Sequence, residues 1–118
     1  MKIDNAIASI AVKDLKAASA WYGKLFGRPA DSSPMPTVAE WKFERGGWLQ
    51  VYELAERAGA GSCTLAVSDI AGVITHLQGM GIDTSEASSG AQVKTVMITD
   101  PDGNHLAFAE ALDPSITR

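Results

Sequence analysis

The sequence carries the same series of structural signals twice. Ala11-Val12-Lys13-Asp14-Leu15 is matched by Ala66-Val67-Ser68-Asp69-Ile70 at an offset of 55 residues. Leu49-Gln50-Val51-Tyr52-Glu53 is matched by Leu106-Ala107-Phe108-Ala109-Glu110 at an offset of 57 residues. A repeat of this length constrains the fold strongly, because both copies must form the same supersecondary unit.

The first copy predicts a strand, a helix and three further strands. Residues 6–12 read as a strand, and Asp14 stands at the N-cap of a helix that Gly27 ends. Residues 30–37 predict a loop or a poor edge strand. Residues 38–44 and 48–53 alternate apolar and polar side chains, which indicates a hairpin.

The second copy repeats this order. Residues 62–67 predict a strand, and Asp69 caps a helix that Gly81 ends. A polar stretch follows at 83–91. Strands at 94–99 and 105–110 then flank Asp100-Pro101-Asp102-Gly103, a turn sequence closed by a left-handed glycine.

Size and charge exclude several classes of protein. The chain has 118 residues, 46% of them hydrophobic, and a formal net charge of −4. We therefore expect a single domain over residues 1–118, made of repeat units 3–56 and 59–112. The absence of a basic stripe argues against nucleic acid. No apolar run approaches the ~20 residues of a membrane span, and no secretory signal is recognised, so the expected location is cytoplasmic.

Metal-binding residue types are scarce. The sequence has one cysteine, Cys63, and two histidines, His76 and His105, which are too far apart for a paired motif. One cysteine excludes an internal disulfide framework and a cysteine-rich zinc site. Alternation places Cys63 toward the helix layer as an inert buried thiol.

The motifs together resemble the vicinal oxygen chelate superfamily of glyoxalase I, bleomycin-resistance proteins and extradiol dioxygenases. The resemblance rests on residues 11–15, Trp21-Tyr22, Leu25-Phe26-Gly27 and, above all, Asp100-Pro101-Asp102-Gly103-Asn104. It implies an α+β fold in which two tandem βαβββ units form a curved mixed sheet, or cup. The helices would cover the convex face and the ligand would occupy the concave face. It also implies a homodimer.

The resemblance further implies four metal-ligand positions, which fall on Ile7, Gln50, Ser62 and Ala107 in this sequence. None of them is a histidine or a carboxylate. Isoleucine and alanine side chains have no lone pair, and neutral serine and glutamine are weak donors for transition metals. We therefore expect no metal and no other cofactor.

Alternation along the predicted strands indicates the concave side chains. Trp48, Gln50 and Tyr52 share one strand face, although ordinary core packing would account for such aromatic residues equally well. The set lacks a carboxylate, which argues against cationic bleomycin, and Glu53 and Glu110 should be solvated on the outward face. The predicted ligand-binding residues are Ile7, Ser9, Trp41, Trp48, Gln50, Tyr52, Ser62, Thr64, His105 and Ala107.

These observations favour a metal-free protein that binds an apolar or aromatic small molecule. An alternative is a metal-independent isomerase or lyase that uses His105 as its base, since imidazole titrates near neutral pH. The sequence offers no concave carboxylate to orient that imidazole, so binding is the preferred hypothesis. A third reading is an interaction module with a filled, ligand-free cup.

Overall fold

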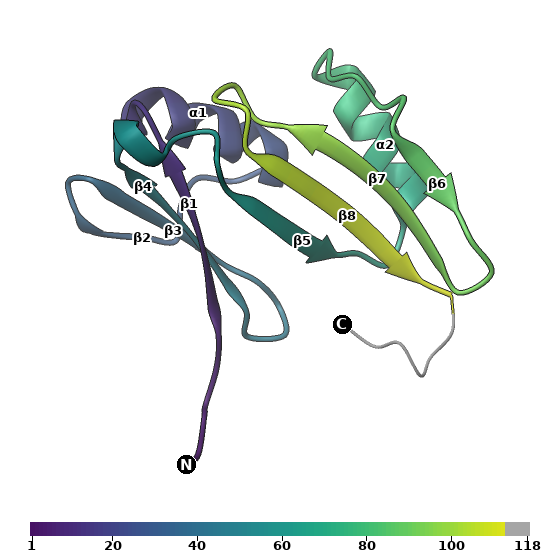
Figure 1. Ribbon diagram of the computed structural model, residues 1–118, viewed down its shortest axis with the longest axis horizontal. Coiled ribbons are helices and arrows are strands. Elements are labelled where there is room, and N and C mark those ends of the chain that lie inside the picture. Colours follow the sequence, from purple (N-terminus) through teal and green to yellow (C-terminus); the bar gives the residue numbers. More distant parts are fainter. Residues whose placement is uncertain (113–118) are drawn as a thin grey trace. The chain divides into compact units, whose positions relative to one another are not determined.

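The computed structural model describes residues 1–112; residues 113–118, which the expected single domain includes, lie outside the described part. The chain divides into two compact units (Figure 1). The first comprises Met1–Gly61 together with Pro101–Asn104, and the second comprises Ser62–Asp100 and the chain from His105 onward. The boundary after Gly61 falls within three residues of the start of the second sequence repeat at residue 59.

The first unit is a four-stranded mixed sheet with one helix. Its strand order is β1-β4-β3-β2, with β1 parallel to β4 and the other neighbours antiparallel. The elements are β1 (Ile7–Val12), α1 (Leu15–Phe26), β2 (Ser32–Met35), β3 (Val38–Lys42), β4 (Trp48–Glu53) and a 3₁₀ turn, η1 (Ala55–Arg57).

The second unit repeats this arrangement. Its strand order is β5-β8-β7-β6, again with the first strand of the unit parallel to the last. The elements are β5 (Ser62–Ala66), α2 (Ile70–Gly79), β6 (Ala87–Ser89), β7 (Val93–Thr99) and β8 (His105–Ala111). The predicted tandem βαβββ order and α+β class are therefore confirmed, and each unit has its own sheet.

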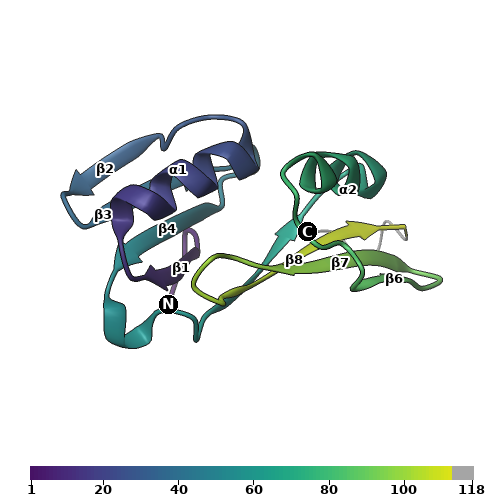
Figure 2. The same cartoon turned by 90° about the horizontal axis from the view of Figure 1, so that it is seen from above.

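Both helices begin where the sequence predicts. The Asp14 carboxylate accepts a hydrogen bond from the Lys16 backbone N–H, and Asp69 accepts one from Gly72. Gly27 closes α1 in the left-handed conformation, at φ 74°. In each unit the helix lies on one face of the sheet (Figure 2), where it covers the apolar core.

Glu53 and Glu110 have a role that the sequence analysis missed. The Glu53 carboxylate accepts a hydrogen bond from the Leu15 backbone N–H at 3.0 Å, and Glu110 accepts one from Ile70 at 2.8 Å. Leu15 and Ile70 are the first residues of the two helices, whose first N–H groups have no partner within the helix. The last strand of each unit therefore holds the start of the helix in that unit.

Asn104 lies in the turn before β8 and hydrogen-bonds to two other segments of the first unit. Its side chain is fully buried, its Oδ1 accepts from the Gly59 and Gly61 N–H groups at 3.1 and 2.9 Å, and its Nδ2 donates to the Ala11 carbonyl at 2.8 Å. A Cβ at Gly59 would overlap the backbone carbonyl of Asp102, and φ there is +89°. This close approach requires glycine.

Candidate functional site

The face of the first sheet opposite α1, here called the open face, carries the candidate site. The strand register places three residues of β4, Trp48, Gln50 and Tyr52, on this face, while Leu49 and Val51 are buried beneath α1. All three side chains on the open face are partly exposed. These three residues therefore share one face of β4, as the alternation along the strand predicted.

A row of four polar side chains crosses this face, one from each strand. Ser9 Oγ lies 3.4 Å from Gln50 Oε1, Gln50 Nε2 donates to Glu40 Oε2 at 2.9 Å, and Ser32 Oγ donates to Glu40 Oε1 at 3.1 Å. The backbone register aligns the same four residues, since Gln50 pairs with both Ser9 and Glu40, and Glu40 with Ser32. This polar row consists of Ser9, Gln50, Glu40 and Ser32.

Two members of the polar row, Glu40 and Ser32, were not among the predicted ligand-binding residues, and Glu40 is the charged one. Its side chain is partly buried, yet it is an acid on the face that was expected to carry no carboxylate. The signal was present in the sequence, because apolar residues at 39, 41 and 43 alternate with polar residues at 40, 42 and 44. Since α1 needs the apolar face, Glu40 has to lie on the other one.

Aromatic side chains flank the polar row. Trp48 stands two residues before Gln50 on β4 and Tyr52 two residues after it. The Lys42 Nζ lies 5.8 Å from the centre of the Trp48 ring, within cation–π range. Ile7 pairs with Trp48 at the edge of the same face and is 55% exposed.

The predicted place of Trp41 on the ligand face is wrong. Its side chain is fully buried, its ring lies 6.0 Å from Tyr22 and 5.7 Å from Phe26, and its indole N–H donates to the Arg28 carbonyl at 3.1 Å. Tyr22 and Phe26 belong to α1, so Trp41 is part of the core between helix and sheet. Its neighbour Glu40 occupies the open face instead.

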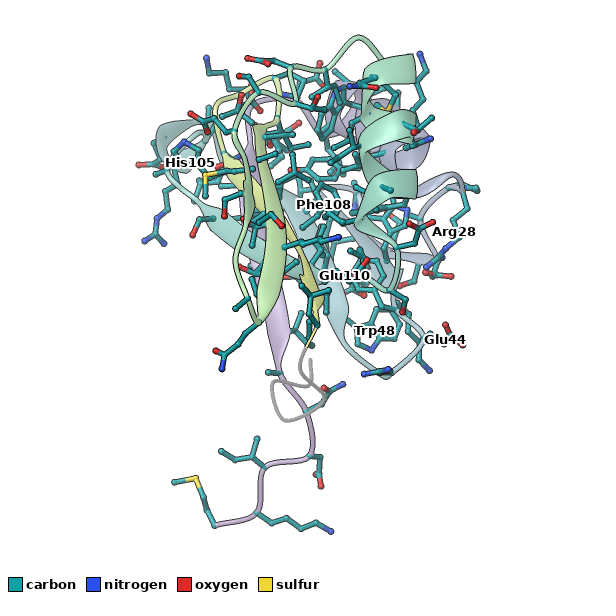
Figure 3. All side chains as sticks on the ribbon, turned by 90° about the vertical axis from the view of Figure 1, so that its right-hand side faces the viewer. Arg28, Glu44, Trp48, His105, Phe108 and Glu110 are labelled. Carbon is teal, nitrogen blue, oxygen red and sulfur yellow. The ribbon has the colours of Figure 1, made fainter. Side chains whose placement is uncertain are left out.

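The remaining predicted residues lie on the face of the second sheet opposite α2. Ser62 pairs with His105, and Thr64 pairs with Ala107. His105 is exposed, and Figure 3 shows it on the side of β8 away from Phe108 and Glu110. Across residues 1–112 the structure shows no hydrogen bond between the His105 imidazole and a carboxylate.

Cys63 alternates with Ser62 and lies on the helix side of β5, paired with Leu106. Burial raises the pKa of its thiol above the ordinary value of 9.0. A thiol with a raised pKa carries little thiolate at neutral pH and is a poor nucleophile. This behaviour agrees with the sequence expectation of an inert side chain.

The family-type metal positions do not fit a transition metal. Ile7 and Ala107 offer no donor atom, and the Gln50 carboxamide is hydrogen-bonded within the polar row. In the described part of the chain, no group of three or more histidine, cysteine or acidic side chains is placed to hold an ion. The donor set at these positions is thus unsuited to the metal that the resemblance implies.

Comparison with solved structures connects this geometry to a family. A glyoxalase/bleomycin resistance protein from Catenulispora acidiphila is 36% identical, with a TM-score of 0.81 over 91% of this chain and 97% of that one. The chain belongs to this family. The βαβββ repeat and the Asp100–Asn104 motif thus identify a member of the vicinal oxygen chelate superfamily, as the resemblance predicted.

Two further structures share the fold of this family member at lower identity. An antibiotic-binding protein from Streptomyces sp. CB03234 is 18% identical, with a TM-score of 0.77 over 94% of this chain and 98% of that one. A bleomycin resistance determinant encoded on the transposon Tn5 is 20% identical, with a TM-score of 0.71 over 94% and 100%. No protein-family model and no curated protein matches the sequence.

Neither helix within residues 1–112 combines the length and apolar character that crossing a membrane would require.

Proposed function

We propose that this protein binds a small organic molecule, without a metal, on the open face of its first sheet. The observation that carries the proposal is the polar row between two partly exposed aromatic side chains, Trp48 and Tyr52. Small-molecule sites commonly combine aromatic walls with a few fixed polar groups. This face offers both on rigid strands rather than on loops.

The spacing along β4 supports an aromatic ligand. Trp48, Gln50 and Tyr52 occupy every second position of one strand. The Cα atoms of Trp48 and Tyr52 are therefore about 13 Å apart, and the polar row crosses the strand midway between them. A ligand ring can stack on either aromatic side chain while its polar substituent reaches the row. The network of hydrogen bonds would fix the orientation of that substituent.

Binding is favoured over the alternative of an isomerase or lyase. That reaction would use His105 as its base, and among the described residues no carboxylate is hydrogen-bonded to the imidazole. The names of two structures with the same fold, an antibiotic-binding protein and a bleomycin resistance determinant, also favour ligand binding.

The test is a thermal-shift screen of aromatic compounds followed by calorimetry on the compounds that bind. Trp48→Ala should weaken binding at least about tenfold, because stacking on an exposed ring is lost. Trp21→Ala is the matched control, since Trp21 lies on α1 and is also partly exposed. The Trp21→Ala variant should bind the same compounds with the affinity of the unmodified protein. A screen without any binder, or equal effects of both substitutions, would contradict the proposal.

The proposal also includes a cytoplasmic homodimer, as the sequence analysis expected. Sedimentation velocity on purified protein would measure the mass, with twice 12.4 kDa expected. A monomer at all concentrations would remove the dimer from the proposal.

A further inference from the structure

Building on the proposed function, the geometry points to Glu40 as the residue that selects the ligand class: an aromatic compound carrying a positively charged nitrogen donor, such as an amidinium or a protonated amine. The inference rests on the direction of the hydrogen bonds in the polar row and on the charges around it.

The hydrogen bonds of the polar row converge on Glu40. Gln50 Nε2 and Ser32 Oγ each donate to a different oxygen of the carboxylate. Each oxygen of an ionised carboxylate can accept about two hydrogen bonds, so each keeps capacity for another donor. A ligand that completes the row at Glu40 must therefore bring N–H or O–H groups rather than acceptors.

The donors that hydrogen-bond to the Glu40 carboxylate, Gln50 and Ser32, are neutral. Among residues 1–112, no lysine or arginine lies within ion-pair distance of its carboxylate. The nearest cation along β3, Lys42, stands over the Trp48 ring, and Arg28 pairs with Asp31. A partly buried carboxylate with neutral donors alone is stabilised further by a cation, because a cationic donor adds charge–charge attraction to the hydrogen bond.

Gln50 acts as a positioning residue in this arrangement. Its Nε2 is held by Glu40, and its Oε1 therefore turns toward Ser9. The carboxamide oxygen becomes a second acceptor beside the carboxylate on the same face. A planar amidinium, with several N–H groups in one plane, can address both acceptors while its ring lies against Trp48 or Tyr52.

The experiment compares two probes of the same shape, cationic 2-naphthamidine and neutral 2-naphthamide, by NMR titration at pH 7. Trp48→Phe assigns the Trp48 indole N–H signal, which reports where the probes bind. The unmodified protein should bind the cationic probe at least about tenfold more tightly. Glu40→Gln, which keeps the shape of the side chain, should reduce this preference below about threefold, and most of the lost affinity should be that for the cationic probe.

Glu44→Gln is the matched control, because Glu44 is an exposed acid just beyond the end of β3. It should keep the full preference for the cation. Equal binding of both probes with shifts at Trp48 would overturn the inference and leave the proposed function standing. A preference that survives Glu40→Gln, or disappears with Glu44→Gln, would overturn the role of Glu40. Binding of neither probe would count against the inference and the proposed function together.

Discussion

Gln50 donates its side-chain N–H to the Glu40 carboxylate at 2.9 Å, across the pairing of β4 with β3. Gln50 occupies one of the positions where the family resemblance implies a metal ligand, yet here its carboxamide belongs to a hydrogen-bonded row. The bond requires the two residues to face the same side of the sheet, and therefore requires Trp41 to face the helix. One strand register thus determines both the polar row and the core.

Truncation of Trp41 should lower stability much more than truncation of Trp48. Trp41→Ala removes a fully buried ring from beneath α1 and should lower the free energy of unfolding by roughly 3–5 kcal/mol. Trp48→Ala removes a partly exposed ring and should cost about 1 kcal/mol or less while it weakens ligand binding. Urea denaturation followed by circular dichroism measures both. Similar losses of stability would contradict the assignment of the two residues to different faces.

Asn104 should be a sensitive position. Asn104→Ala would leave the Gly59 and Gly61 N–H groups and the Ala11 carbonyl without their side-chain partner in a buried environment. A loss of roughly 3 kcal/mol is expected, since each unsatisfied buried group costs about 1–3 kcal/mol and some regain water. Thermal and urea unfolding provide the measurement. Asn5→Ala, at an exposed asparagine, is the control and should change stability by less than about 0.5 kcal/mol.

Glu53 and Glu110 should make similar and independent contributions. Replacement of either by alanine removes one hydrogen bond to the first N–H of a helix and should lower stability by about 1 kcal/mol. The double variant should lose about the sum, because the two carboxylates share no partner. Glu56→Ala, at an exposed residue of η1, serves as the control in the same urea titrations. A clear departure from additivity would argue against two separate capping interactions.

Asp31 should make the stability of the folded protein depend on pH under acidic conditions. The hydrogen bond from Arg28, with a second from the Lys42 backbone N–H, holds the pKa of Asp31 below its ordinary value of 3.8. A pKa lowered by folding means that the stabilisation is complete above the unfolded value and disappears as pH falls through the folded value. The difference in stability between the unmodified protein and Asp31→Asn should therefore shrink as pH falls below about 4. Urea midpoints measured between neutral and acidic pH test this, and a constant difference would contradict it.

Much of the architecture was predictable from local signals. Asp14, Asp69 and Gly27 mark helix ends through contacts within a few residues, so the helices begin and end close to where the sequence places them. The short edge strand β2 lies within the segment 30–37, where loop and edge strand were both open, because serine and proline there give weak signals. Of the predicted ligand residues, Ile7, Ser9, Trp48, Gln50 and Tyr52 come together on one face.

The sequence by itself determined the repeat, the element order and the family, because these depend on local propensity and on side-chain alternation along single strands. Alternation along β3 separates Glu40 from Trp41, but their assignment to the open face and to the helix face follows only from the packing of α1 against the sheet. The tertiary structure also decided the distant partners of Asn104, Glu53 and Glu110. Register between strands and contacts between segments far apart in the chain arise from packing the whole unit, and no short stretch of sequence contains that information.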